Sequence, residues 1–218
     1  MVQVAGPTAA LAGIPAGLQA QGFWAGRRQL FVRFAAEGET ATMYTAEALA
    51  NELRRGTGRS AFHSIAITGR DPLSNVEYLQ AAFGKLPNEL PVMLDTDGQR
   101  PKEIAELKSF LTLAQITLNG SAADAAVDRA VESIDVAAKC GMQHALVVAA
   151  DERTTDAQIL RNIERAHAAS ETVPVIVHPG VSTPVDRDRR WTTLFERASA
   201  LHGDVRLALK LPPPTGMR

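Results

Sequence analysis

Short runs of apolar residues, rich in β-branched side chains, recur along the chain and alternate with stretches of helical periodicity. This alternation is typical of parallel strands joined by crossover helices, because such strands are buried on both faces. The pattern therefore predicts an α/β fold with seven mostly parallel strands. We interpret the runs at residues 30–34, 64–67, 92–94, 115–118, 145–149, 173–177 and 205–209 as these strands.

Apolar residues at helical spacing predict the helices that cover this sheet. Residues 46–53 place their apolar side chains on one helix face, and we expect Gly56 to end that helix. Ser74 and Glu77 predict a capping box, in which each side chain bonds an otherwise unpaired backbone N–H at a helix start. Further helices are predicted around residues 104–107, 127–134, 159–163 and 191–198.

Length and charge limit the classes of function. A chain of 218 residues is long enough to bury a sizeable core and short enough to form one domain. Its formal net charge of -1 gives no global electrostatic reason to bind nucleic acid or an anionic membrane surface. Pro7, Gly13 and Pro15 interrupt the apolar N-terminal stretch, so we expect neither a cleaved signal nor a membrane span. We therefore expect a cytoplasmic protein with neither a nucleic-acid nor a membrane partner.

Cysteine usage limits the redox chemistry of the chain. Cys140 is the one cysteine, so an internal disulfide is excluded. It precedes Gly141 near the end of a predicted helix, where we interpret it as a buried structural thiol. The sequence contains no HExxH, Walker, GxSxG or CxxC motif, so the common motif-defined enzyme classes gain no support.

Polar residues gather directly after the predicted strands. Periodicity alone does not separate an open doubly wound sheet from a closed or partial barrel, but in both arrangements ligands bind at the carboxyl ends of the strands. We expect the polar residues there to share one mouth, although each taken separately also suits a solvated loop. The candidate ligand-binding residues are Arg33, Thr68, Gly69, Arg70, Asp71, Asp95, Asp97, Asn119, His178 and Lys210, and residues 151–153 follow a further strand.

The carboxylates and the histidine of this set carry alternative interpretations. Asp95 and Asp97 suit paired carboxylates for a metal or for acid–base chemistry, but a D-T-D-G stretch is also an ordinary Asx-type turn, which we favour. His178 suits a base or a ligand, whereas a lone histidine at a strand end more often hydrogen-bonds a loop.

Several segments, taken in order, resemble the radical S-adenosylmethionine (radical SAM) superfamily and, within it, the 7-carboxy-7-deazaguanine synthase family. Residues 21–27 (QGFWAGR) and 30–35 (LFVRFA) are similar to that family's glycine-containing opening and first strand. Residues 67–73 (ITGRDPL) resemble its TGGEPL segment, and residues 94–98 (LDTDG) resemble its ETNG segment. The resemblance covers most of the chain.

This resemblance implies the architecture and the assembly of the protein. It implies one partial βα-barrel domain over residues 1–218, with residues 1–28 as an N-terminal extension that packs on it. The family is dimeric, so the resemblance also implies a homodimer. The ending of the chain is similar in placement too, with Lys210 among its polar residues.

The sequence departs from this family in the loop after the first strand, where the family carries a CxxxCxxC motif that holds a four-iron, four-sulfur cluster. Residues 36–43 read AEGETATM and contain neither cysteine nor histidine. A cluster of this type needs thiolate ligands, which carboxylates and a thioether do not replace. We therefore expect no iron–sulfur cluster, no metal site and no reductive cleavage of SAM.

The turn that receives the methionine amino group of SAM in the family is also altered. Arg70 replaces the second glycine of the GGEP segment, and Asp71 is one methylene shorter than its glutamate. A guanidinium at this position repels an ammonium group and fills space that a glycine leaves open. We therefore expect no SAM cofactor, and a pocket that takes an anionic small molecule instead.

Three functional hypotheses follow. The leading one is a cluster-less radical-SAM-fold protein that acts as a noncatalytic binding or assembly partner in a pterin-like or deazapurine-like cofactor pathway. The second is a cluster-free enzyme in which basic residues of the mouth bind an anionic substrate while its carboxylates or His178 move protons. The third is a relic scaffold with only a protein–protein role, which a large exposed apolar patch would indicate.

Overall fold

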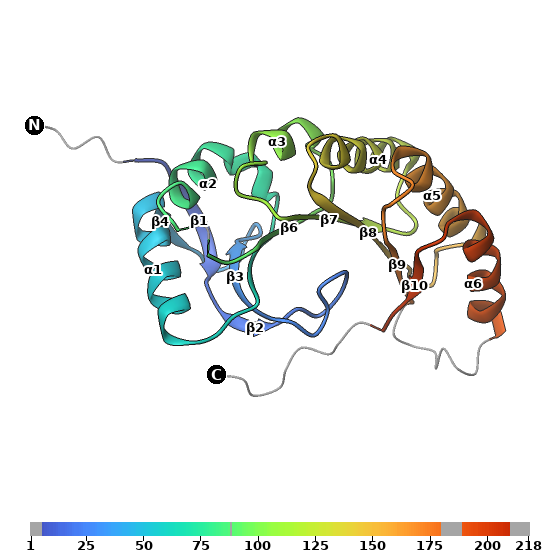
Figure 1. The fold of residues 1–218 in the computed structure, drawn as a ribbon, viewed down its shortest axis with the longest axis horizontal. Coiled ribbons are helices and arrows are strands. Elements are labelled where there is room, and N and C mark those ends of the chain that lie inside the picture. The colour runs from blue at the N-terminus through green and yellow to red at the C-terminus, as the bar shows by residue number, and fades with distance from the viewer. Residues whose placement is uncertain (1–5, 88, 180–188, 210–218) are drawn as a thin grey trace, which may run out of the picture.

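The computed structural model describes residues 6–87, 89–179 and 189–209, and over these residues the chain forms one 10-stranded, mostly parallel sheet. Figure 1 shows the sheet as an arc with the helices along its convex side. The arc does not close, because β10 and β4 are the two ends of the strand order. The α/β partial barrel predicted from the sequence is confirmed. We call the space on the concave side of the sheet the lumen.

The parallel strands lie side by side in the order in which they follow along the chain. They agree with the runs that the apolar pattern predicted and differ from them only at their ends. Side chains alternate along each strand between the helices on one face and the lumen on the other. The strands are β3 (Arg28–Phe34), β5 (Ser64–Gly69), β6 (Val92–Thr96), β7 (Leu113–Asn119), β8 (Gln143–Ala149), β9 (Val175–His178) and β10 (Val205–Leu207).

The helices bury their apolar faces against the convex side of the sheet, and the side chains between these layers form the main core. Leu49 of α1, Leu94 of β6 and Ile134 of α4 are fully buried in it. Covering the convex face in this way removes the apolar side chains of that face from water. The helices are α1 (Ala46–Arg59), α2 (Val76–Phe83), α3 (Pro101–Glu106), α4 (Asp124–Lys139), α5 (Asp156–Ala169) and α6 (Arg189–Leu201).

Three short antiparallel strands extend the sheet beyond β3. Strands β1 (Thr8–Gly13) and β2 (Ala16–Leu18) pair with β3, and β4 (Thr42–Thr45) pairs with β1. The N-terminal segment thus hydrogen-bonds into the sheet. The apolar pattern did not predict these strands, because β1 and β2 consist largely of alanine and glycine, which have low strand propensity.

Two predictions at helix ends are wrong. Helix α1 continues through Gly56 to Arg59, and the glycine lets Leu30 pack close to the helix, since a Cβ would lie 2.8 Å from Leu30 Cδ2. The capping box at Ser74 and Glu77 does not form. Ser74 lies in a 3-10 helix, η1 (Pro72–Asn75), and its hydroxyl donates to the Asp71 carbonyl (2.8 Å), so α2 starts without a side-chain cap.

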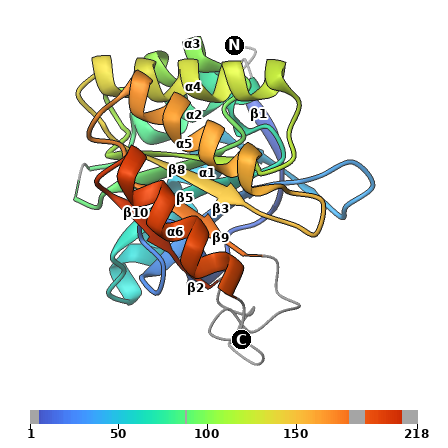
Figure 2. The same ribbon diagram turned by 90° about the vertical axis from the view of Figure 1, so that its right-hand side faces the viewer.

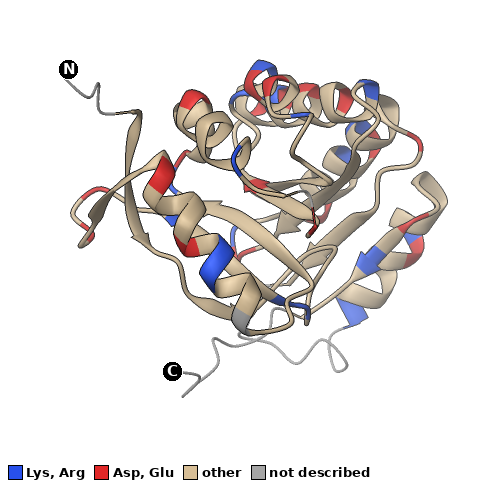
Figure 3. Cartoon of the chain, turned by 60° about the vertical axis from the view of Figure 1, so that its left-hand side comes forward, with Lys and Arg blue, Asp and Glu red and all other residues tan. Residues whose placement is uncertain are grey.

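The charged residues lie mainly along the helices on the convex side, as Figure 3 shows. Many form exposed ion pairs, such as Lys139 with Asp135 in α4 (2.6 Å). Pairs of this kind contribute little to stability and mark an ordinary solvated surface. Among the described residues, no helix combines the length and the apolar character that crossing a membrane requires.

Candidate functional site

The strand register brings several predicted site residues to the carboxyl edge of the sheet. Arg33 of β3 pairs with Thr68 of β5, and Asp95 of β6 pairs with Gln115 of β7. Figure 2 shows the loops that follow β3 and β8 projecting from the same side of the sheet. This edge is where ligands bind in folds of parallel strands. Lys210 lies outside the described residues.

Asp95 is the centre of a hydrogen-bond network on the lumen face. The Thr117 hydroxyl donates to Asp95 Oδ1 (2.7 Å), and the side-chain amide of Gln115 donates to the same oxygen (3.3 Å). Gln115 is fully buried, and its Oε1 accepts from the backbone N–H of Phe23 (3.0 Å). Asp95 is therefore a half-buried acceptor that two donors hold in place.

Sequence reasoning missed Gln115 and Thr117, because it considered only the residues that follow each strand. The signal that would have found them is the polar alternation at residues 115, 117 and 119 within β7. Residues two apart on a strand share one face, so these polar side chains all project toward the lumen side with Asp95.

His178 hydrogen-bonds a loop, which is the second of its two predicted interpretations. It is 3% exposed, and its Nε2 accepts from the backbone N–H of Gly22 (3.2 Å) in the connection between β2 and β3. Figure 1 shows this connection lying inside the arc of the sheet. Phe23 and Trp24 of the same connection pack against the apolar residues of the lumen, which are Ala66, Met93, Leu113, Ala145, Val147 and Ile176.

The turn after β5 holds Arg70 and Asp71 in different surroundings. Gly69 has a φ of 101°, and a Cβ there would lie 2.2 Å from the Phe34 carbonyl oxygen, so only glycine fits. Asp71 is also left-handed (φ 40°), and its carboxylate accepts from Arg100 Nε (2.8 Å) and Nη2 (2.9 Å). The hydrogen bond to Asp71 raises the pKa of the Arg100 guanidinium. Arg70 is exposed.

The remaining candidates hold turns or lie in a surface ion pair. Asp97 Oδ1 accepts from the backbone N–H of Gln99 (3.1 Å), so the Asx-type turn that the D-T-D-G stretch indicates forms. Arg33 pairs with Glu39 (2.7 Å), an acid in the loop that follows its own strand.

The loops after β7 and β8 meet through a serine. The Ser121 hydroxyl donates to Asn119 Oδ1 (2.8 Å) and lies 3.4 Å from Asp151 Oδ2. Asp151 also accepts from the Thr154 hydroxyl (2.8 Å), which is the main reason that the pKa of this carboxyl is lowered. Asn119 and Asp151 therefore order the loops that follow β7 and β8 at the carboxyl edge.

The residues present do not fit an iron–sulfur cluster. Residues 36–43 form a turn and the start of β4, with no thiol among them. Cys140 is the C-cap of α4, at the amino edge of the sheet and opposite the mouth. Within residues 6–87, 89–179 and 189–209, no group of three or more histidine, cysteine or acidic side chains is arranged to hold a metal ion.

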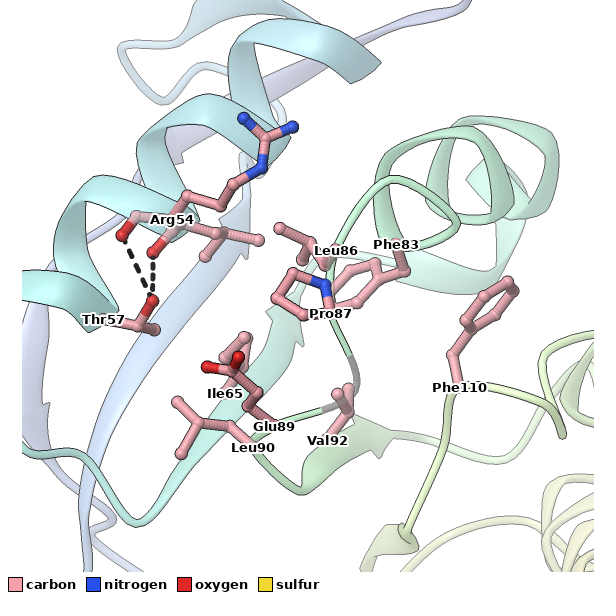
Figure 4. Close-up of a pocket in the computed structure, with 11 residues that line it drawn as sticks. Arg54, Thr57, Ile65, Phe83, Leu86, Pro87, Glu89, Leu90, Val92 and Phe110 are labelled. Carbon is pink, nitrogen blue, oxygen red and sulfur yellow. Dashed lines mark hydrogen bonds between the residues drawn. The ribbon is translucent and has the colours of Figure 1, made fainter.

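Hollows also lie outside the lumen. A groove of about 360 Å³ opens beside the Asp71–Arg100 pair, and Glu77 and Glu103 also line it. An apolar hollow of about 40 Å³ lies at the amino edge, with Phe83 and Phe110 on one wall (Figure 4). Small-molecule sites usually occupy about 300 Å³ or more, so the groove at the carboxyl side reaches the size of a ligand site and the apolar hollow does not.

The chain has a distant, partial similarity to 7-carboxy-7-deazaguanine synthase, the family that its opening and turn segments resemble. It is 27% identical over 115 residues to this synthase from Methanothermobacter thermautotrophicus, and the match covers 46% of this chain and 45% of the synthase. The matched part is thus less than half of that relative. The single cysteine of this chain fits the loss of a cluster motif.

No family model matches the chain. Among solved structures, an enolase from Pseudomonas fluorescens with bound magnesium, potassium and tartrate aligns with a TM-score of 0.36 and 12% identity. The alignment covers 83% of this chain and 46% of the enolase.

Proposed function

We propose that this chain is a cluster-less relative of 7-carboxy-7-deazaguanine synthase that binds an anionic small molecule of the pterin or deazapurine type at its carboxyl edge. In this role it is a noncatalytic binding or assembly partner in a cofactor pathway, acting as a homodimer or with a partner protein. The similarity over 115 residues supports the relationship, and the absence of cysteine from residues 36–43 supports the loss of the cluster.

The exposed guanidinium of Arg70 carries the proposal. Both carboxylate oxygens of Asp71, its neighbour in sequence, accept hydrogen bonds from Arg100. The charge of Asp71 is therefore already paired and does not neutralise Arg70. Arg70 also precedes η1 and α2, and the unpaired N–H groups at a helix start favour anions. A guanidinium forms bidentate pairs with carboxylate and phosphate groups, which are stronger than neutral hydrogen bonds.

SAM is a poor ligand for a site that contains the Arg70 guanidinium. It presents a sulfonium and an ammonium, and both would approach the Arg70 cation. Because Arg70 is exposed, water screens this repulsion to about 1 kcal/mol for two unit charges 4 Å apart. The preference for an anion over SAM therefore follows from the replacement of one glycine by arginine.

Calorimetry with two probes tests the proposal. We expect a carboxylated pterin to bind the wild-type chain and SAM not to bind, and Arg70→Gly to weaken pterin binding about tenfold. Arg54→Gln is the matched control, because Arg54 is an exposed arginine of α1 at the amino edge, and it should leave the affinity unchanged. Micromolar SAM binding by the wild type would overturn the proposal.

The network around Asp95 favours a second candidate, a cluster-free enzyme. Two side-chain donors hold this carboxylate on the lumen face, as a positioned proton acceptor requires. The two candidates differ in what Asp95→Asn does. Loss of turnover with retained folding and retained ligand binding would favour the enzyme, whereas a binding protein has no turnover to lose.

A further inference from the structure

The connection between β2 and β3, residues 19–27, is a closed loop that fills part of the lumen. Its two ends meet, because Gln19 N–H donates to the Arg27 carbonyl (2.9 Å) and Gly26 N–H donates to the Gln19 carbonyl (2.8 Å). A further bond from Arg27 N–H to the Trp24 carbonyl (3.1 Å) tightens it. The loop therefore satisfies much of its own backbone and is joined to the sheet through one narrow neck. We call it the plug.

Two backbone donors at the tip hold the plug in the lumen. Gly22 N–H donates to His178 Nε2 (3.2 Å), and Phe23 N–H donates to Gln115 Oε1 (3.0 Å). Arg206 of β10 adds a contact, with its guanidinium 5.1 Å from the centre of the Phe23 ring. The tip thus bridges strands from the middle of the sheet to its far edge, across the open side of the partial barrel.

The fit of the tip depends on a glycine. Gly22 has a φ of 83°, and a Cβ there would lie 1.9 Å from Gln115 Oε1. Gly26, in the same loop, has a similar φ of 79°, but its Cβ would meet nothing within 4 Å. The two glycines therefore carry the same backbone strain on substitution, and only Gly22 carries the contact with the lumen.

We propose that the plug is a built-in lid, which moves out of the lumen as a unit about the neck formed by Gln19 and Arg27. Its self-contained backbone bonds survive this movement. The two bonds at the tip, the packing of Phe23 and Trp24, and the ring contacts of Phe23 with Arg206 and of Trp24 with His63 are lost. Gln115 also donates to Asp95, so the lid and the mouth share one side chain. Control of ligand access by the lid rests on the function proposed above, whereas the movement itself does not.

Native-state hydrogen exchange of the wild-type chain tests the movement without any ligand. Local opening is detected as exchange that is faster than global unfolding allows. We expect the Gly22 and Phe23 amides to exchange about 100-fold faster than the amides of β7, and with little dependence on denaturant. Exchange at the rate of β7 and with its full denaturant dependence would show that the plug opens only when the protein unfolds, and would overturn the proposal.

A pair of glycine variants tests the contact at the tip. We expect Gly22→Ala to speed exchange across residues 19–27 at least about tenfold relative to Gly26→Ala, while exchange in β7 stays at the wild-type rate. Equal exchange in the two variants would show that the contact with Gln115 does not hold the lid and would contradict the proposal. Should Gly22→Ala fail to fold, the wild-type exchange pattern still decides, and failure of pterin binding alone would sink only the proposed function.

Discussion

Tyr78 is a polar residue in the main core whose hydroxyl has no hydrogen-bond partner among the described residues. The residue is 2% exposed, and its ring packs edge-on against Phe34 with 6.3 Å between the ring centres. Burial is the main cause that raises the pKa of this hydroxyl, and the nearby Tyr44 adds to it. A buried donor without a partner loses its bonds to water and gains none in return.

We therefore predict that Tyr78→Phe stabilises the protein by about 1 kcal/mol at neutral pH. The folded pKa of Tyr78 is raised above its ordinary value of 10.0, so the unfolded chain loses this proton first as the pH rises. The wild-type protein is therefore unaffected below pH 10.0 and loses stability as the pH rises from there through the folded pKa. Denaturant titrations at pH 7 and above pH 10 measure both effects, and the variant should lack this alkaline loss. Tyr44→Phe, the matched control, should retain most of it, because burial is the main cause of the raised pKa. A Tyr78→Phe variant that is less stable than wild type at pH 7 would refute the account.

A buried histidine joins α6 to α5 and to the residue ahead of β9. His202 directly follows α6 and is 3% exposed. Its Nε2 donates to the Val173 carbonyl ahead of β9 (2.6 Å), and its Nδ1 lies 3.0 Å from His167 Nδ1 of α5. Because a carbonyl only accepts, Nε2 carries the hydrogen, and in the neutral pair His167 donates to His202.

We predict that His202→Leu lowers the free energy of unfolding by about 2 kcal/mol, because it leaves a buried carbonyl without a donor. His167→Leu is the matched control. His167 is half-buried, and among the described residues its side chain bonds His202 and no carbonyl, so its loss should be clearly smaller. Chemical denaturation of the two variants measures the difference, and an equal or larger loss for His167→Leu would show that the bond to Val173 does not anchor α6.

The elements themselves were predictable where burial sets the pattern. The β-branched strands and amphipathic helices came directly from periodicity, since each must bury one or both faces. Prediction failed where contacts between residues far apart in the sequence decide the local structure. Gly56 suggests a helix end but is small because Leu30 packs over it, and the Ala- and Gly-rich β1 is a strand because β3 offers it an edge.

At the scale of the whole molecule, the sequence predicted the edge that carries the mouth but not how its side chains pair. Asp71 binds Arg100, Gln115 binds the backbone of Phe23, and His178 binds that of Gly22, over separations of 29, 92 and 156 residues. Such partners are set by the tertiary fold, and no local motif announces them. Pairing between residues close in sequence was predictable, as the turn at Asp97 shows.

The proposal above makes this chain a relative of 7-carboxy-7-deazaguanine synthase that does not assemble an iron–sulfur cluster. Anaerobic reconstitution of the protein with iron and sulfide, followed by metal and sulfide analysis and a visible spectrum, tests it most directly. Because one thiol at the amino edge does not replace three at the mouth, we predict no stoichiometric iron and no charge-transfer absorption. A stable brown species with about four irons per chain would contradict the account.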